Sequence, residues 1–330
     1  MKLGSVLALV AGLLLLALVI AHGDLPQVGH LLAQLSWPGA VWVMALFTLA
    51  WAAEILAWAL TFTQRRPGAR WLVQLWRVNM VGEAMNVVMP FGALGGEPVK
   101  AWLLKRHYGV GYREAAATLV LMQTLLGVAE ALFVAAGALL AAALGILPVT
   151  VEHLLGSAAL ALLGVMALTM FGLRRRWLRA LLEACERRYG GARYAAIKDS
   201  LVDIELALAD FARHQGPRFA ATTLLFLLNW LGGAAEVWLL LTLLGAPLPF
   251  AHCWVAEAAV VTIRSLTFFL PAQLGSVEAV TVYVITALGG GADLGLALAA
   301  LRRARELAWS ALGLGVAAAY QLEWRAAARG

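Results

Sequence analysis

The chain has 330 residues, of which 62% are hydrophobic and 13% charged, and its formal net charge is +6. Soluble domains carry about 25% charged and about 45–50% apolar residues, so this composition excludes a soluble enzyme, a disordered chain and a disulfide scaffold. It predicts an all-α polytopic membrane protein. The positive charge indicates membrane topology, because basic residues gather on the cytoplasmic side of spans, and we expect no nucleic-acid partner.

Six apolar segments are long enough to cross a bilayer, which takes about 20 predominantly apolar residues. They are 3–21, 38–62, 114–145, 154–173, 219–244 and 293–320. The first is also open to interpretation as a secretory signal peptide ending near Ala21. Its apolar run, however, exceeds the roughly 7–15 residues that are usual there, and further spans follow. We therefore predict about six spanning helices.

The distribution of lysine and arginine orients these spans. Neither residue occurs in the segments 22–37, 146–153, 245–252 and 289–293. Basic residues instead follow the second span, precede the third, lie between the fourth and the fifth, and end the chain. Because basic loops stay in the cytoplasm, both termini are expected on that side.

Two further apolar stretches do not fit the alternation of spans across the membrane, because both ends of each lie on the same side. Segment 71–104 has basic residues at both ends and segment 251–289 at neither, and each has a proline and glycine break near its middle, at Pro90 and Pro271. Non-helical backbone at membrane depth is tolerated only where protein or a water-filled cavity surrounds it. We interpret both stretches as re-entrant helical hairpins that enter the membrane from opposite sides.

The two halves of the chain resemble each other. The sequence AAEI at 52–55 recurs as AAEV at 234–237, and Pro90 matches Pro271 at nearly the same offset. The order of span, span, hairpin and span occurs twice in opposite orientation, as in the inverted repeats of many transporters. We predict one membrane repeat over 1–145 and a second over 146–330.

Residues 174–217 form the longest polar segment, and they lie inside the second predicted repeat. Apolar residues recur there at helical spacing among basic and acidic ones, with a break at Gly190 and Gly191. This pattern is typical of amphipathic helices on the cytoplasmic membrane surface. We interpret the segment as a linker between the repeats, with docking of a partner as the alternative.

A cluster of charge lies about ten residues into the last span. A charged side chain at a span centre costs roughly 2.5–3.5 kcal/mol, so such a residue usually faces a partner or a cavity. Arg302, Arg305 and Glu306 share one helix face, and Arg303 points about a quarter turn away. Because a guanidinium binds phosphate in bidentate fashion, we interpret the cluster as an anionic-headgroup site. The alternatives are buried ion pairs, or a last span that is really two shorter elements.

The two hairpin tips supply further headgroup candidates. Gly95 and Gly96 allow a tight turn before a new helix, with Lys100 one turn into it, and Ser276 is an N-cap candidate in the second hairpin. A helix N-terminus buried in the membrane presents unpaired N–H groups and partial positive charge. Such an end suits a phosphate oxygen.

Three glutamates beside these features have two interpretations. Glu97 and Glu278 lie at the starts of the helices that follow the tips, and Glu306 follows the arginines. They either stabilise helix ends and ion pairs, or take up and release protons and so couple or gate transport.

Other polar residues in apolar segments are candidates for lining a pathway. Asn79, Glu83 and Asn86 recur three to four residues apart and so form a stripe on one helix face. Arg264 is the predicted partner of Glu83, because the two occupy corresponding positions in the halves. The full set of pathway candidates is Asn79, Glu83, Asn86, Arg264, Glu54 and Glu236.

Catalytic signatures are scarce. The sequence contains no P-loop, GxSxG, HExxH, paired CxxC or Rossmann fingerprint, and its six histidines lack metal-ligand spacing. We therefore assign no catalytic residue, metal or cofactor. Transport is expected to use an ion gradient, a lipid gradient or no energy source.

Two motifs resemble a known family. NxxxPxxxxGGEPVKA at 86–101, with YGV at 108–110 and EAA at 114–116, resembles the flippase-like transmembrane region of lysylphosphatidylglycerol synthases and its stand-alone bacterial relatives. FxxPxxxGxxE at 268–278 and RRxRE at 302–306 are similar to the same family, and within it to membrane proteins associated with hopanoid biosynthesis.

The resemblance implies a multi-pass protein of the bacterial inner membrane that moves lipids between leaflets. Lys100 stands where the family motif usually has arginine, which argues against a bidentate phosphate clamp there. The chain stops at Gly330 without an aminoacyl-transfer domain, so we expect no synthase activity.

The leading hypothesis from the sequence is a lipid flippase or transporter for a polar or anionic headgroup on a phospholipid, a hopanoid or a polyprenyl-linked lipid. One alternative is an integral-membrane enzyme that modifies a lipid headgroup, with Glu97 or Glu278 as general base. Another is a non-catalytic scaffold that docks lipid-biosynthesis enzymes through 174–217. Membrane lipids and such enzymes are the expected partners, and the sequence does not set the oligomeric state.

Overall fold

The computed structural model is helical wherever it describes the chain. The residues it describes are Leu14, Ile20, 24–88, 95–175, Trp177, Glu183, 192–268, Leu270 and 273–327. Every secondary-structure element longer than a single turn among them is an α-helix. The prediction of an all-α protein is confirmed.

Four of the helices are long and apolar enough to cross a membrane. They are α3 (Trp37–Thr61), α6 (Tyr112–Leu144), α7 (Val149–Arg175) and α10 (Gly216–Leu243). Each matches one of the six predicted spans, so the chain is a polytopic membrane protein. The predicted span 3–21 lies outside the described residues except for Leu14 and Ile20.

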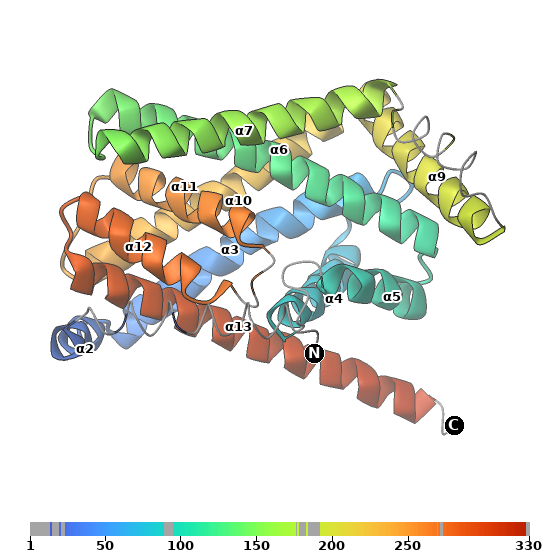
Figure 1. Ribbon diagram of the computed structural model, residues 1–330. Coiled ribbons are helices and arrows are strands. Elements are labelled where there is room, and N and C mark those ends of the chain that lie inside the picture. The colour runs from blue at the N-terminus through green and yellow to red at the C-terminus, as the bar shows by residue number, and fades with distance from the viewer. Residues whose placement is uncertain are drawn as a thin grey trace.

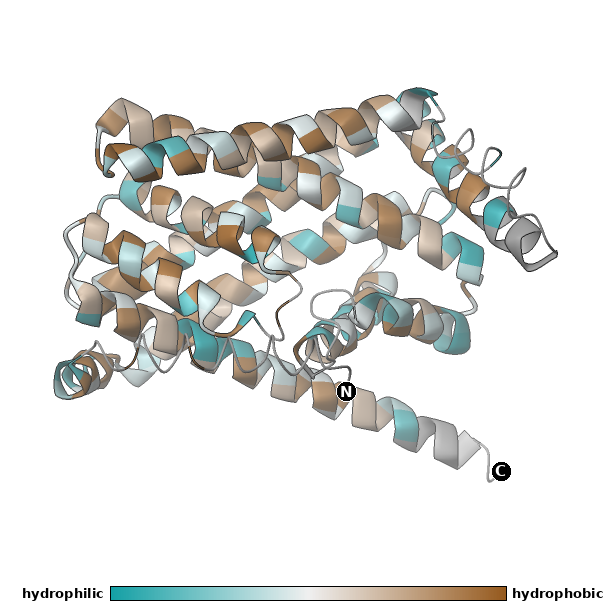
Figure 2. Ribbon diagram, viewed as in Figure 1, coloured by the Kyte–Doolittle hydropathy of each residue, from teal (hydrophilic) through white to brown (hydrophobic). Residues whose placement is uncertain are grey.

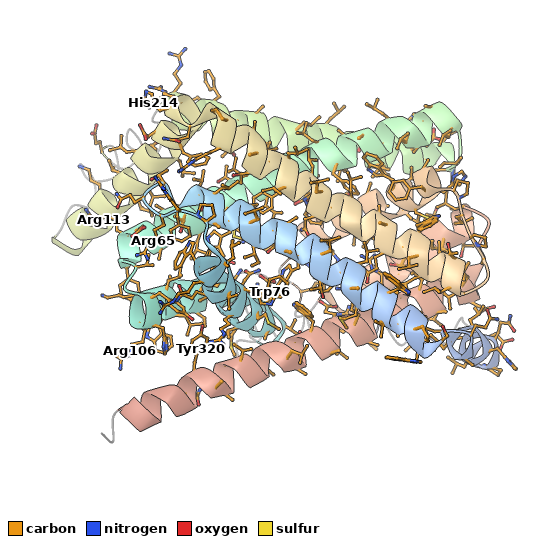
Figure 3. The ribbon with its side chains drawn as sticks, turned by 180° about the vertical axis from the view of Figure 1, so that it is seen from behind. Arg65, Trp76, Arg106, Arg113, His214 and Tyr320 are labelled. Carbon is orange, nitrogen blue, oxygen red and sulfur yellow. The ribbon has the colours of Figure 1, made fainter. Side chains whose placement is uncertain are left out.

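The connections between helices gather at two opposite ends of the bundle (Figure 1). The connections 34–36, 145–148, 244–249 and 288–291, which lack lysine and arginine, lie at one end. The connections 62–68 and 109–111 lie at the other, where Figure 3 also shows Arg65, Arg106 and Arg113. This separation of basic from non-basic connections is the one that the charge pattern predicted.

The first predicted hairpin corresponds to two packed helices, α4 (Ala69–Val88) and α5 (Gly96–Tyr108). Helix α4 begins and α5 ends at the basic end of the bundle (Figure 1). A Cβ added at Gly96 would lie 2.1 Å from the carbonyl oxygen of Gly82, so only glycine permits this approach. The connecting residues 89–94, with Pro90, lie outside the described part.

The second predicted hairpin corresponds to α11 (Phe250–Leu266) and α12 (Ser276–Ala287), which begin and end at the opposite end (Figure 1). Gly275, with a φ of 79°, precedes α12, and such a backbone favours glycine. Ser276 is therefore the first helical residue, and its prediction as the N-cap is wrong. Its hydroxyl instead donates to the carbonyl oxygen of Gln273 at 3.0 Å. Pro271 lies outside the described residues.

The last helix, α13, runs unbroken from Ala292 to Ala327 over 36 residues, or about 54 Å at 1.5 Å per residue. The alternative that the arginines separate two shorter elements is therefore wrong. Figure 2 shows a hydrophilic stretch about a third of the way along α13. The helix is not among the four candidate spans in the described part of the chain. The charged residues 302–306 explain this, because they lower the hydropathy of the helix.

Two shorter helices complete the described structure. Helix α2 (Leu25–Ala33) packs against α13, and the backbone N–H of Asp24 donates to Asp293 at 2.9 Å. Helix α9 (Ala192–His214) falls in the predicted amphipathic linker 174–217 and buries Leu208 and Phe211 in the hydrophobic core. It thus packs on the bundle, while the first half of that linker lies mostly outside the described residues.

The two halves have corresponding helices of similar length. Helices α3, α4, α5 and α6 have 25, 20, 13 and 33 residues, and α10, α11, α12 and α13 have 28, 17, 12 and 36. Helices α3 and α10 pack so closely that a Cβ at Gly232 would lie 2.5 Å from that of Ala50. The inverted repeat over 1–145 and 146–330 stays a prediction, and most of its first span lies outside the described residues.

Candidate functional site

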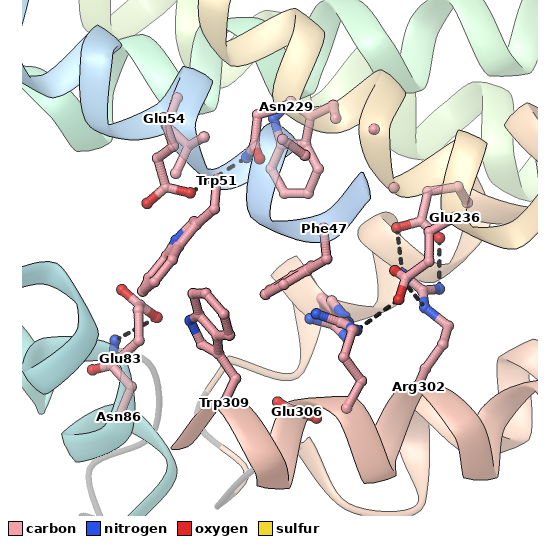
Figure 4. Close-up of a pocket in the computed structure, with 18 of the residues that line it drawn as sticks. Phe47, Trp51, Glu54, Glu83, Asn86, Asn229, Glu236, Arg302, Glu306 and Trp309 are labelled. Carbon is pink, nitrogen blue, oxygen red and sulfur yellow. Dashed lines mark hydrogen bonds and ion pairs between the residues drawn. The ribbon is translucent and has the colours of Figure 1, made fainter. Parts of the chain in front are cut away.

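A cavity of about 360 Å³ lies among α3, α4, α6, α10, α11 and α13 (Figure 4). Its walls come from both halves of the chain, and they combine charged side chains with aromatic rings. The charged side chains that line it are Glu54, Glu83, Glu236, Glu257, Arg264, Arg302, Arg305 and Glu306. All of these except Glu257 were predicted site residues. With Asn86, which also lines the cavity, they make up half of the 16 residues that the sequence singled out.

The arginine that is buried most deeply, Arg302, is matched by carboxylates. Its Nη1 and Nη2 donate to the two oxygens of Glu257 at 2.6 and 2.8 Å, and its Nε lies 3.6 Å from Glu236. Arg302 is 8% exposed and Glu257 is 3% exposed. This bidentate geometry is the one that guanidinium groups form with carboxylates, and a protein partner therefore takes the place predicted for a headgroup.

Arg305 is matched on the same side of α13. Its Nε lies 2.6 Å from a carboxylate oxygen of Glu236. Its guanidinium carbon lies 3.8 Å from the centre of the Phe47 ring, a cation–π contact between α13 and α3.

Arg303 points away from Arg302, as its position on the helix predicted. Its Nε and Nη2 donate to Glu278 at 2.8 and 2.5 Å, and its Nη1 donates to Glu306 at 2.8 Å. Arg303 thus joins α13 to the first turn of α12. It does not line the cavity, although Arg302, Arg305 and Glu306 do.

The first half has its own charged cluster. Lys100 is completely buried, and its Nζ lies 2.8 Å from Glu83 and 2.9 Å from Glu97. Glu97 also accepts a hydrogen bond from Gln123 at 3.1 Å. Lys100 and Glu97 do not line the cavity, so the structure does not support direct contact between Lys100 and a headgroup.

The backbone N–H groups at the two helix starts already have acceptors. The N–H of Gly96, next to Gly95, donates to the side-chain oxygen of Asn86 at 2.6 Å. The N–H of Gly275 donates to Glu278 at 2.8 Å. Both groups are satisfied by the protein itself, which argues against the predicted phosphate contacts at these two N–H groups.

Two cavity charges stand apart from these pairs. Glu54 accepts hydrogen bonds from the amides of Asn79 at 3.0 Å and Asn229 at 3.4 Å, and it forms no ion pair with a described residue. The guanidinium of Arg264 forms no ion pair or hydrogen bond within the described structure, and its Nε is buried. The predicted pairing of Arg264 with Glu83 is therefore wrong, because Glu83 forms its ion pair with Lys100.

The sequence reasoning missed the aromatic wall of the cavity. Trp309 on α13 lies 4.5 Å from Trp51 and 5.1 Å from Phe47, measured between ring centroids. Phe47, Trp51 and Glu54 are spaced by four and three residues on α3, so helical periodicity places them on one face. That spacing was the signal that could have revealed them.

Glu257 and Asn229 were also missed as site residues. Both lie inside apolar stretches, and only their contacts with Arg302 and Glu54 distinguish them. Among the residues described, no group of three or more His, Cys, Asp or Glu side chains is arranged to hold a metal ion.

A helical bundle with four candidate spans and an internal cavity of paired charges is a polytopic membrane protein. The family model described as the lysylphosphatidylglycerol synthase TM region matches residues 5–315, which is almost the whole chain. The protein therefore belongs to this family of membrane-lipid proteins, as the two motifs predicted. Comparisons with curated proteins and with solved structures gave no match.

Proposed function

We propose that this protein moves a lipid with a polar headgroup between the leaflets of a bacterial inner membrane. The observation that carries the proposal is the charged cavity of about 360 Å³ inside an otherwise apolar bundle. Binding pockets for small molecules measure about 300–1,000 Å³, so this one suits a headgroup while the acyl chains stay in lipid. Membership of a membrane-lipid family supports a lipid as substrate.

The two helix pairs supply a route in this proposal. Helices α4 and α5 would dip into the membrane from the cytoplasmic side, and α11 and α12 from the other side. Side chains of α4 and α11 line the cavity between them. A polar cavity at this depth replaces the water that a headgroup loses, and the energetic barrier to crossing hydrocarbon is thereby lowered.

The enzyme alternative receives less support from the contacts. Glu97 and Glu278, its candidate general bases, are engaged by Lys100 and Arg303. Each carboxylate would have to leave its cation before it could contact a lipid headgroup. The same pairs, with the one between Arg303 and Glu306, also argue against the three predicted proton-coupling glutamates.

The test is a leaflet-resolved assay with the purified protein in vesicles. Lipids that carry a fluorophore on one acyl chain are reconstituted, and a membrane-impermeant quencher then reports how much lipid reaches the outer leaflet over time. We expect the protein to accelerate this movement, and Ser310→Trp to block it because Ser310 lines the cavity. Ser157→Trp, on the exposed face of α7, is the matched control.

Three outcomes would contradict the proposal. One is lipid movement no faster than in protein-free vesicles, and another is full activity in Ser310→Trp. The third is chemical conversion of the lipid headgroup, detected by mass spectrometry, which would favour the enzyme.

A further inference from the structure

The charges of the cavity are matched in pairs with two exceptions, and the exceptions have opposite signs. Glu83 pairs with Lys100, Glu236 with Arg305, Glu257 with Arg302, and Glu306 with Arg303. Glu54 and Arg264 remain without an ionic partner in the described structure. An unpaired charge in a desolvated site is costly, so these two side chains are where a charged ligand gains most by binding.

The hydrogen bonds of Glu54 suit a carboxylate. One of its oxygens accepts a hydrogen bond from Asn79 and the other accepts one from Asn229. An ionised carboxylate is an acceptor at both oxygens, whereas a protonated one must donate from one of them. The two amides stabilise the negative form, whereas burial of the side chain opposes it. A cation bound beside Glu54 would supply the stabilisation that the ionised form lacks.

Aromatic rings stand next to this carboxylate. Trp51 lies one turn before Glu54 on α3, and Figure 4 shows Trp309 beside Trp51, between Glu54 and Arg302. Both rings line the cavity. The face of an indole ring attracts an ammonium group. The contact of Arg305 with Phe47 at 3.8 Å shows that this wall already binds one cation. Carboxylate and indole together are the chemistry of an ammonium site.

Arg264 supplies the complementary chemistry. It projects from the last turn of α11 into the cavity, and its buried Nε lacks a hydrogen-bond acceptor. A guanidinium presents a fork of donors that fits a phosphate. The arginines of the α13 cluster are less available, because carboxylates hold them.

We propose that the headgroup bound in this cavity is a zwitterion, with its ammonium group at Glu54, Trp51 and Trp309 and its phosphate at Arg264. This inference rests on the proposed function, since it names the class of lipid that the same cavity takes. It narrows the polar or anionic headgroup that the sequence suggested. An amine-bearing phospholipid fits both unpaired charges, whereas an anionic one leaves Glu54 unmatched.

The first experiment compares lipids that share one labelled acyl chain and differ in the headgroup. Phosphatidylethanolamine carries the ammonium, its N-acetylated form keeps the phosphate without it, and phosphatidylglycerol is anionic. A lost charge-assisted hydrogen bond is worth roughly a tenfold change. We therefore expect the protein to move phosphatidylethanolamine at least about tenfold faster than the other two. Equal rates, or a preference for phosphatidylglycerol, would overturn the assignment.

The second experiment assigns the preference to residues. Glu54→Gln should remove the advantage of phosphatidylethanolamine and leave movement of its N-acetylated form unchanged, while Arg264→Gln should slow both. Glu130→Gln is the matched control, because Glu130 is a half-buried glutamate hydrogen-bonded to Ser265 outside the cavity. If Glu54→Gln keeps the preference, the ammonium site is wrong. Trp309→Leu leaves the ion pairs in place and should also reduce the preference, which keeps the idea testable if Glu54→Gln does not fold.

A third measurement separates this inference from the proposed function. Glycerophosphoethanolamine, the soluble headgroup, should raise the thermal unfolding temperature of the protein in detergent, and glycerol 3-phosphate should do so less. If the protein moves several lipids at equal rates and neither compound discriminates, the proposed function stands and the zwitterion assignment fails. If no lipid moves, the proposed function fails. Uptake of the soluble headgroup into vesicles would then identify a soluble zwitterion as substrate.

Discussion

Removing the carboxylate of Glu257 should be among the most destabilising single changes in the bundle. Glu257→Gln keeps the shape of the side chain but leaves the buried Arg302 with only Glu236, whose nearest oxygen lies 3.6 Å from its Nε. Breaking a buried ion pair from one side costs about 3–5 kcal/mol, because the remaining charge is uncompensated. Glu236 compensates part of this charge, so we expect a loss of about 3 kcal/mol.

The protein carries a convenient reporter for this measurement. Cys253 is a free and fully buried thiol, so a thiol-reactive dye labels it only on unfolding. A Cys185→Ser background removes the other cysteine of the chain. The unfolding temperature of Glu257→Gln in detergent should fall by several degrees.

Two further variants complete this experiment. Glu114→Gln breaks a half-exposed pair with Arg65 at 3.8 Å and should change little, because such pairs contribute about 0–1 kcal/mol. The double variant Glu257→Met with Arg302→Met should recover much of the stability, since neither charge of this pair is left and Glu236 keeps Arg305 as its partner. The reasoning is refuted if Glu257→Gln unfolds at the wild-type temperature, or if the double variant is less stable than the single one.

Two more predictions concern the first helix pair, and both use the same thermal assay. Gly96→Ala places a methyl group 2.1 Å from a backbone oxygen of α4, so it should lower stability by about 1–3 kcal/mol. Gly156→Ala, where nothing lies within 4 Å, should be neutral or stabilising by up to about 1 kcal/mol, and equal effects would contradict the close packing. Lys100→Met leaves two carboxylates without their shared cation and should destabilise strongly. Adding Glu97→Gln should restore part of the loss, and no restoration would argue against the pairing.

The sequence predicted the class of protein and the layout of the chain well. Composition is decisive for a bilayer protein, and the positions of lysine and arginine are set by topology rather than by packing. Four predicted spans and both helix pairs match helices of the structure. The cluster around Arg302 was found because charge in an apolar segment is conspicuous.

The partners of those charges could not be predicted. Whether Glu83 meets Lys100 or Arg264 depends on how helices distant in sequence pack, and that information is spread over many side chains. Trp76 shows the same limit. Nothing in its local sequence indicates that its ring packs 5.2 Å from that of Trp51, which lines the cavity.

The paired charges of α13 also bear on how the chain enters the membrane during synthesis. Arg302, Arg303 and Arg305 make this helix unfavourable in lipid by itself, since each arginine at a span centre costs roughly 2.5–3.5 kcal/mol. Their glutamate partners on α10, α11 and α12 precede them in the chain. When the ribosome delivers α13, the counter-charges are already in place. Its stable insertion therefore depends on the second half having begun to assemble, and a chain truncated before α10 and spliced to α13 would fail to retain this helix in the bilayer.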